Sequence, residues 1–80
     1  MQEHINISLI REGVSRDLRI PTRIEVRTLI MELNKIFGLP LMMRKCQLRV
    51  VNKGILLDEG KVLADYPVTS GDVIEIEEFE

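Results

Sequence analysis

The helical signal in this sequence is confined to one segment, residues 24–37, and this constrains the fold more than any other feature. Apolar residues recur there at intervals of three and four, the spacing of one buried helical stripe: Val26, Leu29, Ile30, Leu33, Ile36 and Phe37. Thr22 and Glu25 have the spacing of a capping box at its start. Gly38, followed by Pro40, is a stop signal at its end. With a single helix, the 80 residues must complete their core with strands.

Alternation of polar and apolar residues predicts those strands. Residues 4–9 and 15–21 should form a hairpin that turns at Glu12-Gly13. Further strands are expected at 47–52, 55–57 and 73–77, with glycine-containing turns between them. The strand residues expected to point into the core are Ile5, Ile7, Leu9, Leu18, Ile20, Leu48, Val50, Ile74 and Ile76.

The predicted order is therefore strand, strand, helix, strand, short strand, strand. A helix laid across one face of a mixed sheet buries the apolar faces of both, and this order predicts an α+β fold of the β-grasp type. A length of 80 residues with 45% hydrophobic side chains suits one core, so we expect one domain over residues 1–80 and a complete small protein. The other face of the sheet is left open to water or to a partner.

Charge is divided unevenly along the chain. Residues 1–53 hold ten of the eleven Lys and Arg, whereas residues 54–80 hold eight of the thirteen Asp and Glu. Because the halves of so small a domain interleave in space, their charges partly cancel, which argues against a simple nucleic-acid binder. Mutual attraction between strands and a polar surface for a charged partner both remain open. A nucleic-acid-binding or regulatory alternative would use a group of four arginines: Arg16, Arg19, Arg23 and Arg27.

Side chains suited to catalysis are scarce. His4 is the single histidine and Cys46 the single cysteine, so one molecule cannot assemble a histidine-based triad or metal cluster. Gly54, Gly60 and Gly71 are isolated turn glycines rather than a phosphate-binding loop. We expect no enzyme activity and no cofactor. The sequence also has no secretory signal and no apolar window of about 20 residues, which predicts a cytoplasmic protein without direct membrane insertion.

The second half of the chain, from Arg49 to Tyr66, resembles ubiquitin. It has a hydrophobic strand, a glycine turn, an acidic pair before Gly60, and the sequence Leu63-Ala64-Asp65-Tyr66. The resemblance implies that the ring of Tyr66 seals the crossover loop and that its hydroxyl bonds nearby backbone. Ubiquitin is conjugated through a flexible Gly-Gly tail, whereas this sequence ends Glu-Glu-Phe-Glu. A protein modifier or sulfur carrier is therefore a disfavoured alternative.

Four segments, two of them within 49–66, carry a closer resemblance: Asp17-Leu18-Arg19, Arg49-Val50-Val51-Asn52-Lys53, Leu63-Ala64-Asp65 and Thr69-Ser70-Gly71-Asp72. They look like the YukD/EsaB proteins, small ubiquitin-like proteins that accompany bacterial type VII (ESX, WXG100) secretion machinery. The resemblance implies a non-catalytic accessory protein that docks non-covalently onto cytoplasmic parts of that machinery. Its implied partners are the membrane-bound FtsK/SpoIIIE-type ATPase or other membrane subunits, with recruitment to the inner face of the cell membrane.

The candidate interaction surface is the open sheet face with Arg49, Val51, Glu75 and Glu77. Ubiquitin presents an apolar patch there, and the two glutamates stand in place of a histidine and an apolar residue, so ubiquitin receptors should not bind. The loop with Met42 and Met43 is the second candidate surface; in the alternative interpretation it is a lid over the core. A homodimer through an exposed sheet edge also remains open.

Overall fold

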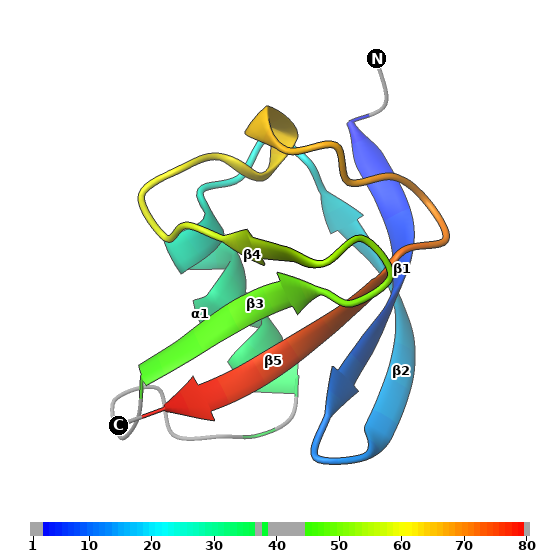
Figure 1. Ribbon diagram of the computed structural model, residues 1–80, viewed down its shortest axis with the longest axis vertical. Coiled ribbons are helices and arrows are strands. Elements are labelled where there is room, and N and C mark those ends of the chain that lie inside the picture. The colour runs from blue at the N-terminus through cyan, green and yellow to red at the C-terminus, as the bar shows by residue number, and fades with distance from the viewer. Residues whose placement is uncertain (1–2, 37, 39–44, 80) are drawn as a thin grey trace.

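The predicted order of elements is confirmed in the computed structural model, which describes residues 3–36, 38 and 45–79. Strands β1 and β2 precede α1, the one α-helix among these described residues, and a short 3-10 helix, η1, lies between β4 and β5 (Figure 1). The bounds are β1 His4–Arg11, β2 Val14–Pro21, α1 Val26–Ile36, β3 Lys45–Val50, β4 Ile55–Leu57, η1 Leu63–Asp65 and β5 Val73–Phe79. The strands form one mixed sheet in the order β2-β1-β5-β3-β4, in which only β1 and β5 are parallel. The predicted α+β class is therefore confirmed.

The β1–β2 hairpin is longer than the sequence predicts because its turn is tight. Glu12 and Gly13 both have positive φ, at 47° and 81°, and they connect directly paired Arg11 and Val14. Two-residue turns with positive φ match the twist of the flanking strands, so pairing continues up to the turn. At the other hairpin, β3 ends at Val50 rather than residue 52, because Gly54 turns the chain and its N–H donates to the Val50 carbonyl at 2.8 Å.

Helix α1 begins two residues later than predicted, and the predicted capping box is wrong. Thr22 lies four residues before Val26 and instead donates its backbone N–H and its hydroxyl to the carbonyl of Glu3, at 2.8 and 3.3 Å. The stop signal is confirmed, since Gly38 has φ 68° and donates to the Lys35 carbonyl at 3.0 Å.

The buried face of α1 differs from prediction at its C-terminal end. Ile36 is 44% exposed rather than buried, and Phe37 lies outside the described residues. Asn34 is buried instead, with its Nδ2 3.8 Å from the Cys46 Sγ. The buried stripe therefore runs toward β3 at this end, where Cys46 is also buried.

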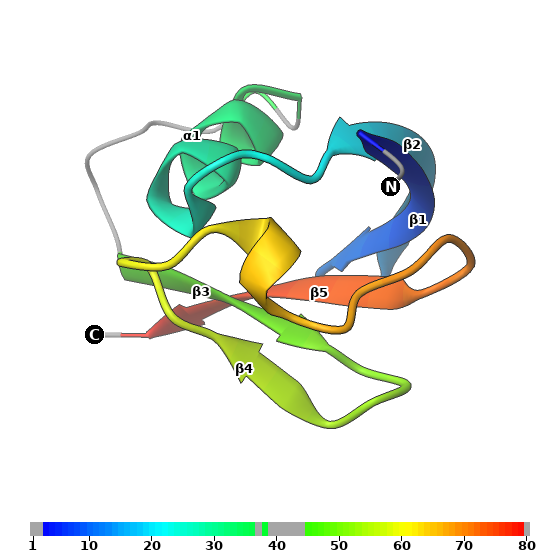
Figure 2. The ribbon, with the colours of Figure 1, turned by 90° about the horizontal axis from the view of Figure 1, so that it is seen from above.

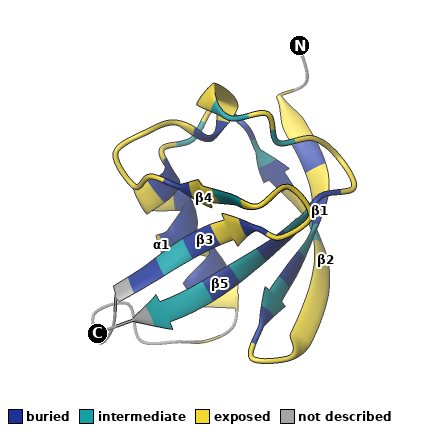
Figure 3. Cartoon of the chain, in the orientation of Figure 1, coloured by how far each residue is buried: buried dark blue, intermediate teal, exposed yellow. Residues whose placement is uncertain are grey.

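Figure 2 shows α1 over one face of the sheet, and the core lies between them. Every strand residue predicted to point inward is buried except Leu18, which is half-buried on the edge strand β2. Figure 3 shows that β2 is mostly exposed. The side chains with least exposure come from all the layers: Leu9, Val26, Leu29, Leu33, Leu48, Val50, Leu63 and Ile74. The helix thus contributes side chains three and four residues apart to this core, and each strand contributes every second side chain.

The crossover between β4 and β5 is closed by Tyr66. Its hydroxyl oxygen accepts a hydrogen bond from the backbone N–H of Asp58 at 2.8 Å, and its ring packs against the core. Leu63, in η1, is buried and donates its N–H to the Ile24 carbonyl at 2.9 Å, which ties the crossover to the segment before α1. The role that the ubiquitin resemblance implies for Tyr66 is confirmed.

Candidate protein-binding face of the sheet

A row of five side chains, one from each strand, crosses the sheet on the face away from α1. We call it the central row; in sheet order it consists of Ser15, Ile10, Glu75, Arg49 and Leu56. Residues next to it along the strands, Leu9, Val50 and Ile74, are buried in the core beneath the helix. Because successive side chains of a strand point to opposite faces, the central row faces outward. Figure 1 looks onto this open face, with α1 behind the sheet.

Arg49 pairs diagonally rather than across the row. Its Nε lies 3.2 Å from Oε1 of Glu77, and the same oxygen accepts a hydrogen bond from Gln47 Nε2 at 3.1 Å. Glu77 stands directly opposite Gln47, whereas Arg49 stands directly opposite Glu75. The pair is partly exposed, so it contributes at most about 0.2–1 kcal/mol to stability. The cross-strand pairing that the sequence suggested thus exists for one glutamate of the two.

Glu75 is left as an unpaired carboxylate near the middle of the open face. Within the described part of the chain it makes no side-chain hydrogen bond or ion pair, although it is only partly exposed. Ile10 stands beside it on one strand and Arg49 on the other. A half-buried carboxylate with no protein partner depends on water for its solvation.

Two exposed aliphatic side chains lie beside these charges. Val51, at the turn that follows β3, is 47% exposed and donates its N–H to the Val73 carbonyl of β5 at 2.8 Å. Leu56, opposite Arg49, is 52% exposed. Leu56 was not among the surface residues predicted from the sequence, although its place between inward-facing Ile55 and Leu57 was a usable signal.

The predicted surface residues Arg49, Val51, Glu75 and Glu77 therefore belong to one neighbourhood of β3 and β5. The second candidate surface, with Met42 and Met43, lies outside the described residues. Whether those residues contact a partner or cover the core stays a prediction.

The four arginines do not converge on one patch. Arg16 stands opposite Leu9 and Arg19 opposite Asn6, so they project from opposite faces of the sheet. Arg27 lies on α1, with its Nε 3.9 Å from Oε2 of Glu59. The four arginines are close in sequence, which suggested a cluster, but successive side chains of β2 point to opposite faces of the sheet and separate Arg16 from Arg19.

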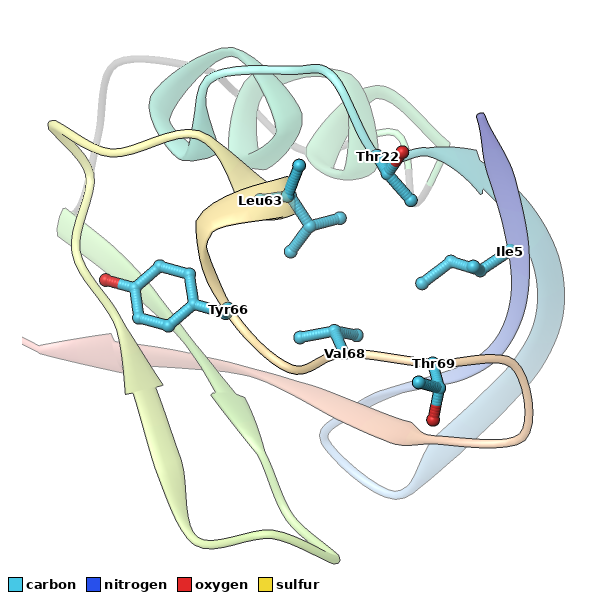
Figure 4. Close-up of a pocket in the computed structure, with 7 residues that line it drawn as sticks. Ile5, Thr22, Leu63, Tyr66, Val68 and Thr69 are labelled. Atoms are coloured by element: carbon cyan, nitrogen blue, oxygen red, sulfur yellow. The ribbon is translucent and has the colours of Figure 1, made fainter. Parts of the chain in front are cut away.

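A pocket of about 270 Å³ lies apart from the central row, at the crossover. Figure 4 shows Ile5, Leu63 and Val68 facing its interior, with Thr22 and Thr69 along its wall. Ala64 and Tyr66 complete the lining, and the Tyr66 hydroxyl is engaged by the Asp58 N–H. Aliphatic walls of this kind favour packing rather than proton transfer.

The described ranges offer neither a metal cluster nor a membrane-spanning helix. Among their side chains, no group of three or more His, Cys, Asp or Glu could hold a metal ion. Residues 3–36, 38 and 45–79 also include no helix of the length and apolar character needed to cross a bilayer.

Known structures establish the class of this protein. The ubiquitin-like domain of Plasmodium falciparum Dsk2 superimposes with a TM-score of 0.77 at 21% identity, over 95% of this chain and 99% of that one. The N-terminal ubiquitin-like domain in the 4931431F19Rik protein gives a TM-score of 0.77 at 12% identity, over 100% of this chain and 79% of that one. With α1 packed on one face of a mixed five-stranded sheet, the protein is a ubiquitin-like β-grasp protein.

The family is shown by sequence. The model of the WXG100 protein secretion system (Wss) protein YukD matches residues 4–76, and the chain belongs to this YukD family. No curated protein sequence matches it significantly. A chain of a structure titled "MycP5-free ESX-5 inner membrane complex, State II" shares the fold, with a TM-score of 0.68 at 16% identity, over 98% of this chain but 21% of that chain.

Proposed function

We propose that this protein is a non-catalytic accessory component of a bacterial type VII secretion system. The single observation that carries the proposal is the family match over residues 4–76. The protein would act in the cytoplasm and dock onto the inner face of the membrane machinery. Its candidate partners are the membrane-bound FtsK/SpoIIIE-type ATPase and other membrane subunits.

The likeness to the ESX-5 inner membrane complex supports a docking role. There, a domain of this fold forms about a fifth of a longer chain in an assembled secretion complex, since this chain spans 21% of it. A separate ubiquitin-like chain could offer the same shape to such machinery from solution. The outward side chains around the central row would then form the contact surface.

We propose that the docking is non-covalent and that residues 77–79 take part in it as a strand of the sheet. Here Glu77 is bound by Arg49 and Gln47, and Glu78 is ion-paired with the buried Arg11. Phe79 is still paired with Lys45 in the sheet. Residues 77–79 are therefore held within the sheet.

Affinity capture from producing cells tests the proposal. The protein, tagged at its N-terminus, is eluted once under native and once under denaturing conditions, and both eluates are analysed by mass spectrometry. Type VII membrane components in the native eluate alone are expected. Adducts of higher mass that survive denaturation would instead indicate a covalent modifier, and the absence of type VII components from both eluates would reject the accessory role.

A further inference from the structure

Glu75 gives the open face a chemical preference that its other side chains do not. We infer that the Glu75 carboxylate receives a basic side chain of the docking partner, and that Leu56 and Val51 contact aliphatic residues flanking that base. The partner segment would therefore carry an Arg or Lys between aliphatic side chains. This inference rests on the proposed docking function and specifies its partner.

The first argument is the missing counter-charge. Arg49 is the cation directly opposite Glu75, yet its Nε is held at 3.2 Å by Glu77, and Gln47 reinforces that arrangement at 3.1 Å. On the other side of Glu75 stands Ile10, which offers no donor. The cation that stands opposite Glu75, Arg49, is thus already paired with another carboxylate, and Glu75 itself has no ion-pair partner among the described residues.

The second argument concerns desolvation. In the free protein, water solvates Glu75 and its lack of a partner has little cost. A docked partner removes that water, and a buried carboxylate without donors is strongly unfavourable. A guanidinium or ammonium group would restore the lost interactions, whereas an apolar or acidic group would leave the charge unpaired. Glu75 therefore discriminates between partners by excluding those that lack a base.

The third argument is the apolar margin. Val51 and Leu56 are among the most exposed large hydrophobic side chains of the described residues, at 47% and 52%. Both adjoin the charged group, Leu56 opposite Arg49 and Val51 beside the start of β5. Interface centres are rich in apolar contacts, and arginine is among the residue types enriched there. Two carboxylates, Glu75 and Glu77, also disfavour phosphate groups here, which argues for a protein rather than a nucleic acid.

NMR titration with a designed peptide tests the inference directly. The probe is a short peptide with one arginine between leucines, and its twin has glutamine in place of that arginine. Amide shifts should concentrate on β3 and β5 around Glu75, and the glutamine twin should bind at least about tenfold more weakly, since a charged hydrogen bond is lost. No binding at millimolar peptide, or shifts confined to another surface, would overturn the inference.

Glu75→Gln is the matching protein variant, because it keeps the shape and breaks no side-chain hydrogen bond or ion pair among the described residues. Its melting temperature should equal that of the wild type, while its affinity for the arginine peptide should fall about tenfold. Glu32→Gln, on α1 behind the sheet, removes the same charge at a distance and should bind like the wild type. Equal affinity of Glu75→Gln and the wild type would reject a contact at Glu75.

Native capture with the three proteins separates this inference from the proposed function. Type VII components captured by the wild type and by Glu32→Gln, but lost with Glu75→Gln, would support both. Equal capture by all three would reject the role of Glu75 and leave the accessory function standing. Capture by none of them would reject the accessory function itself, and with it the partner inferred for Glu75.

Discussion

The ammonium Nζ of Lys53 lies 2.8 Å from Oδ2 of Asp72, and this pair joins the turn after β3 to the turn before β5. Asp72 is only 3% exposed. It also accepts hydrogen bonds from Asn52 Nδ2 and from the Thr69 N–H, each at 2.9 Å. Burial by itself would raise the pKa of Asp72. The hydrogen bonds from Lys53, Asn52 and Thr69 and the charge of Lys53 outweigh burial, so the pKa is lowered from its usual 3.8.

The lowered pKa of Asp72 predicts a specific loss of stability in acid. A carboxyl group with a lower pKa in the folded state stabilises it fully above the unfolded-state pKa, and the contribution is lost as pH falls from 3.8 through the folded-state pKa. Asp72→Asn should therefore unfold more easily than the wild type at neutral pH, by about 1–3 kcal/mol. The difference should shrink in acid.

Urea unfolding followed over a range of pH checks this, with Glu32→Gln as a control for the loss of one surface carboxylate. A difference between wild type and Asp72→Asn that stayed constant down to the most acidic pH would show that the Asp72 charge is not what stabilises the two turns.

Removing the Tyr66 hydroxyl should loosen the crossover. Tyr66→Phe keeps the ring against the core but leaves the Asp58 N–H without its 2.8 Å acceptor. Since Asp58 is exposed and water can replace the lost acceptor, we expect destabilisation of about 0.5–1.5 kcal/mol by urea unfolding. Faster hydrogen exchange at Asp58 is the accompanying local sign. Unchanged exchange there would contradict a sealing role for this hydroxyl.

The buried ion pair of Arg11 and Glu78 should depend on both partners. The Arg11 side chain is 7% exposed and that of Glu78 23%, and Arg11 Nη1 is buried without a hydrogen-bond acceptor in the described part of the chain. Glu78→Gln leaves a buried cation without its counter-charge, which should cost about 2–3 kcal/mol, less than for a fully buried pair because Glu78 reaches solvent.

The double variant Arg11→Met with Glu78→Leu supplies the control. Replacing both charges with apolar groups should recover stability to within about 1 kcal/mol of the wild type. Thermal unfolding of the three proteins measures the effect. If the double variant were less stable than Glu78→Gln, charge pairing would not be the reason for the loss.

Reversing the Arg49–Glu77 pair should separate docking from folding. The double variant Arg49→Glu with Glu77→Arg retains an ion pair across β3 and β5 but places a second carboxylate opposite Glu75, so it should lose no more than about 0.2–1 kcal/mol of stability. The positions of its positive and negative charges are exchanged, so native capture of the secretion components should fall markedly. Undiminished capture by this variant would place the docking surface elsewhere.

Ubiquitin receptors should not bind this protein. Receptors that use ubiquitin's apolar sheet patch would have to desolvate the Glu75 carboxylate, which has no matching charge among the described residues, and the Arg49–Glu77 ion pair beside it. Titration calorimetry with a ubiquitin-receptor domain is therefore expected to show no heat of binding. Micromolar affinity would mean that the open face tolerates an apolar partner, against the preference assigned to Glu75.

Local sequence patterns determined most of the secondary structure. The helical stripe through Val26 and Leu33, the alternation through Ile5 and Ile7, and the glycine turn at Gly13 each depend on residues within one or two turns of one another. Such patterns also sufficed to put Arg49 and Glu75 on the face away from α1. The short segments that resemble YukD proteins likewise indicated the family, because they are contiguous stretches of sequence.

Tertiary structure decided which of these side chains are partners. Arg49 could pair with either glutamate of β5, and only the packed sheet shows that it takes Glu77 and leaves Glu75 open. Likewise, Arg11 pairs with Glu78 because β1 lies beside β5, far along the chain. Strand registers over such separations follow from packing the whole core beneath α1. Sequence alone therefore assigned Arg49 and Glu75 to the open face, and the fold determined which carboxylate on it has no partner among the described residues.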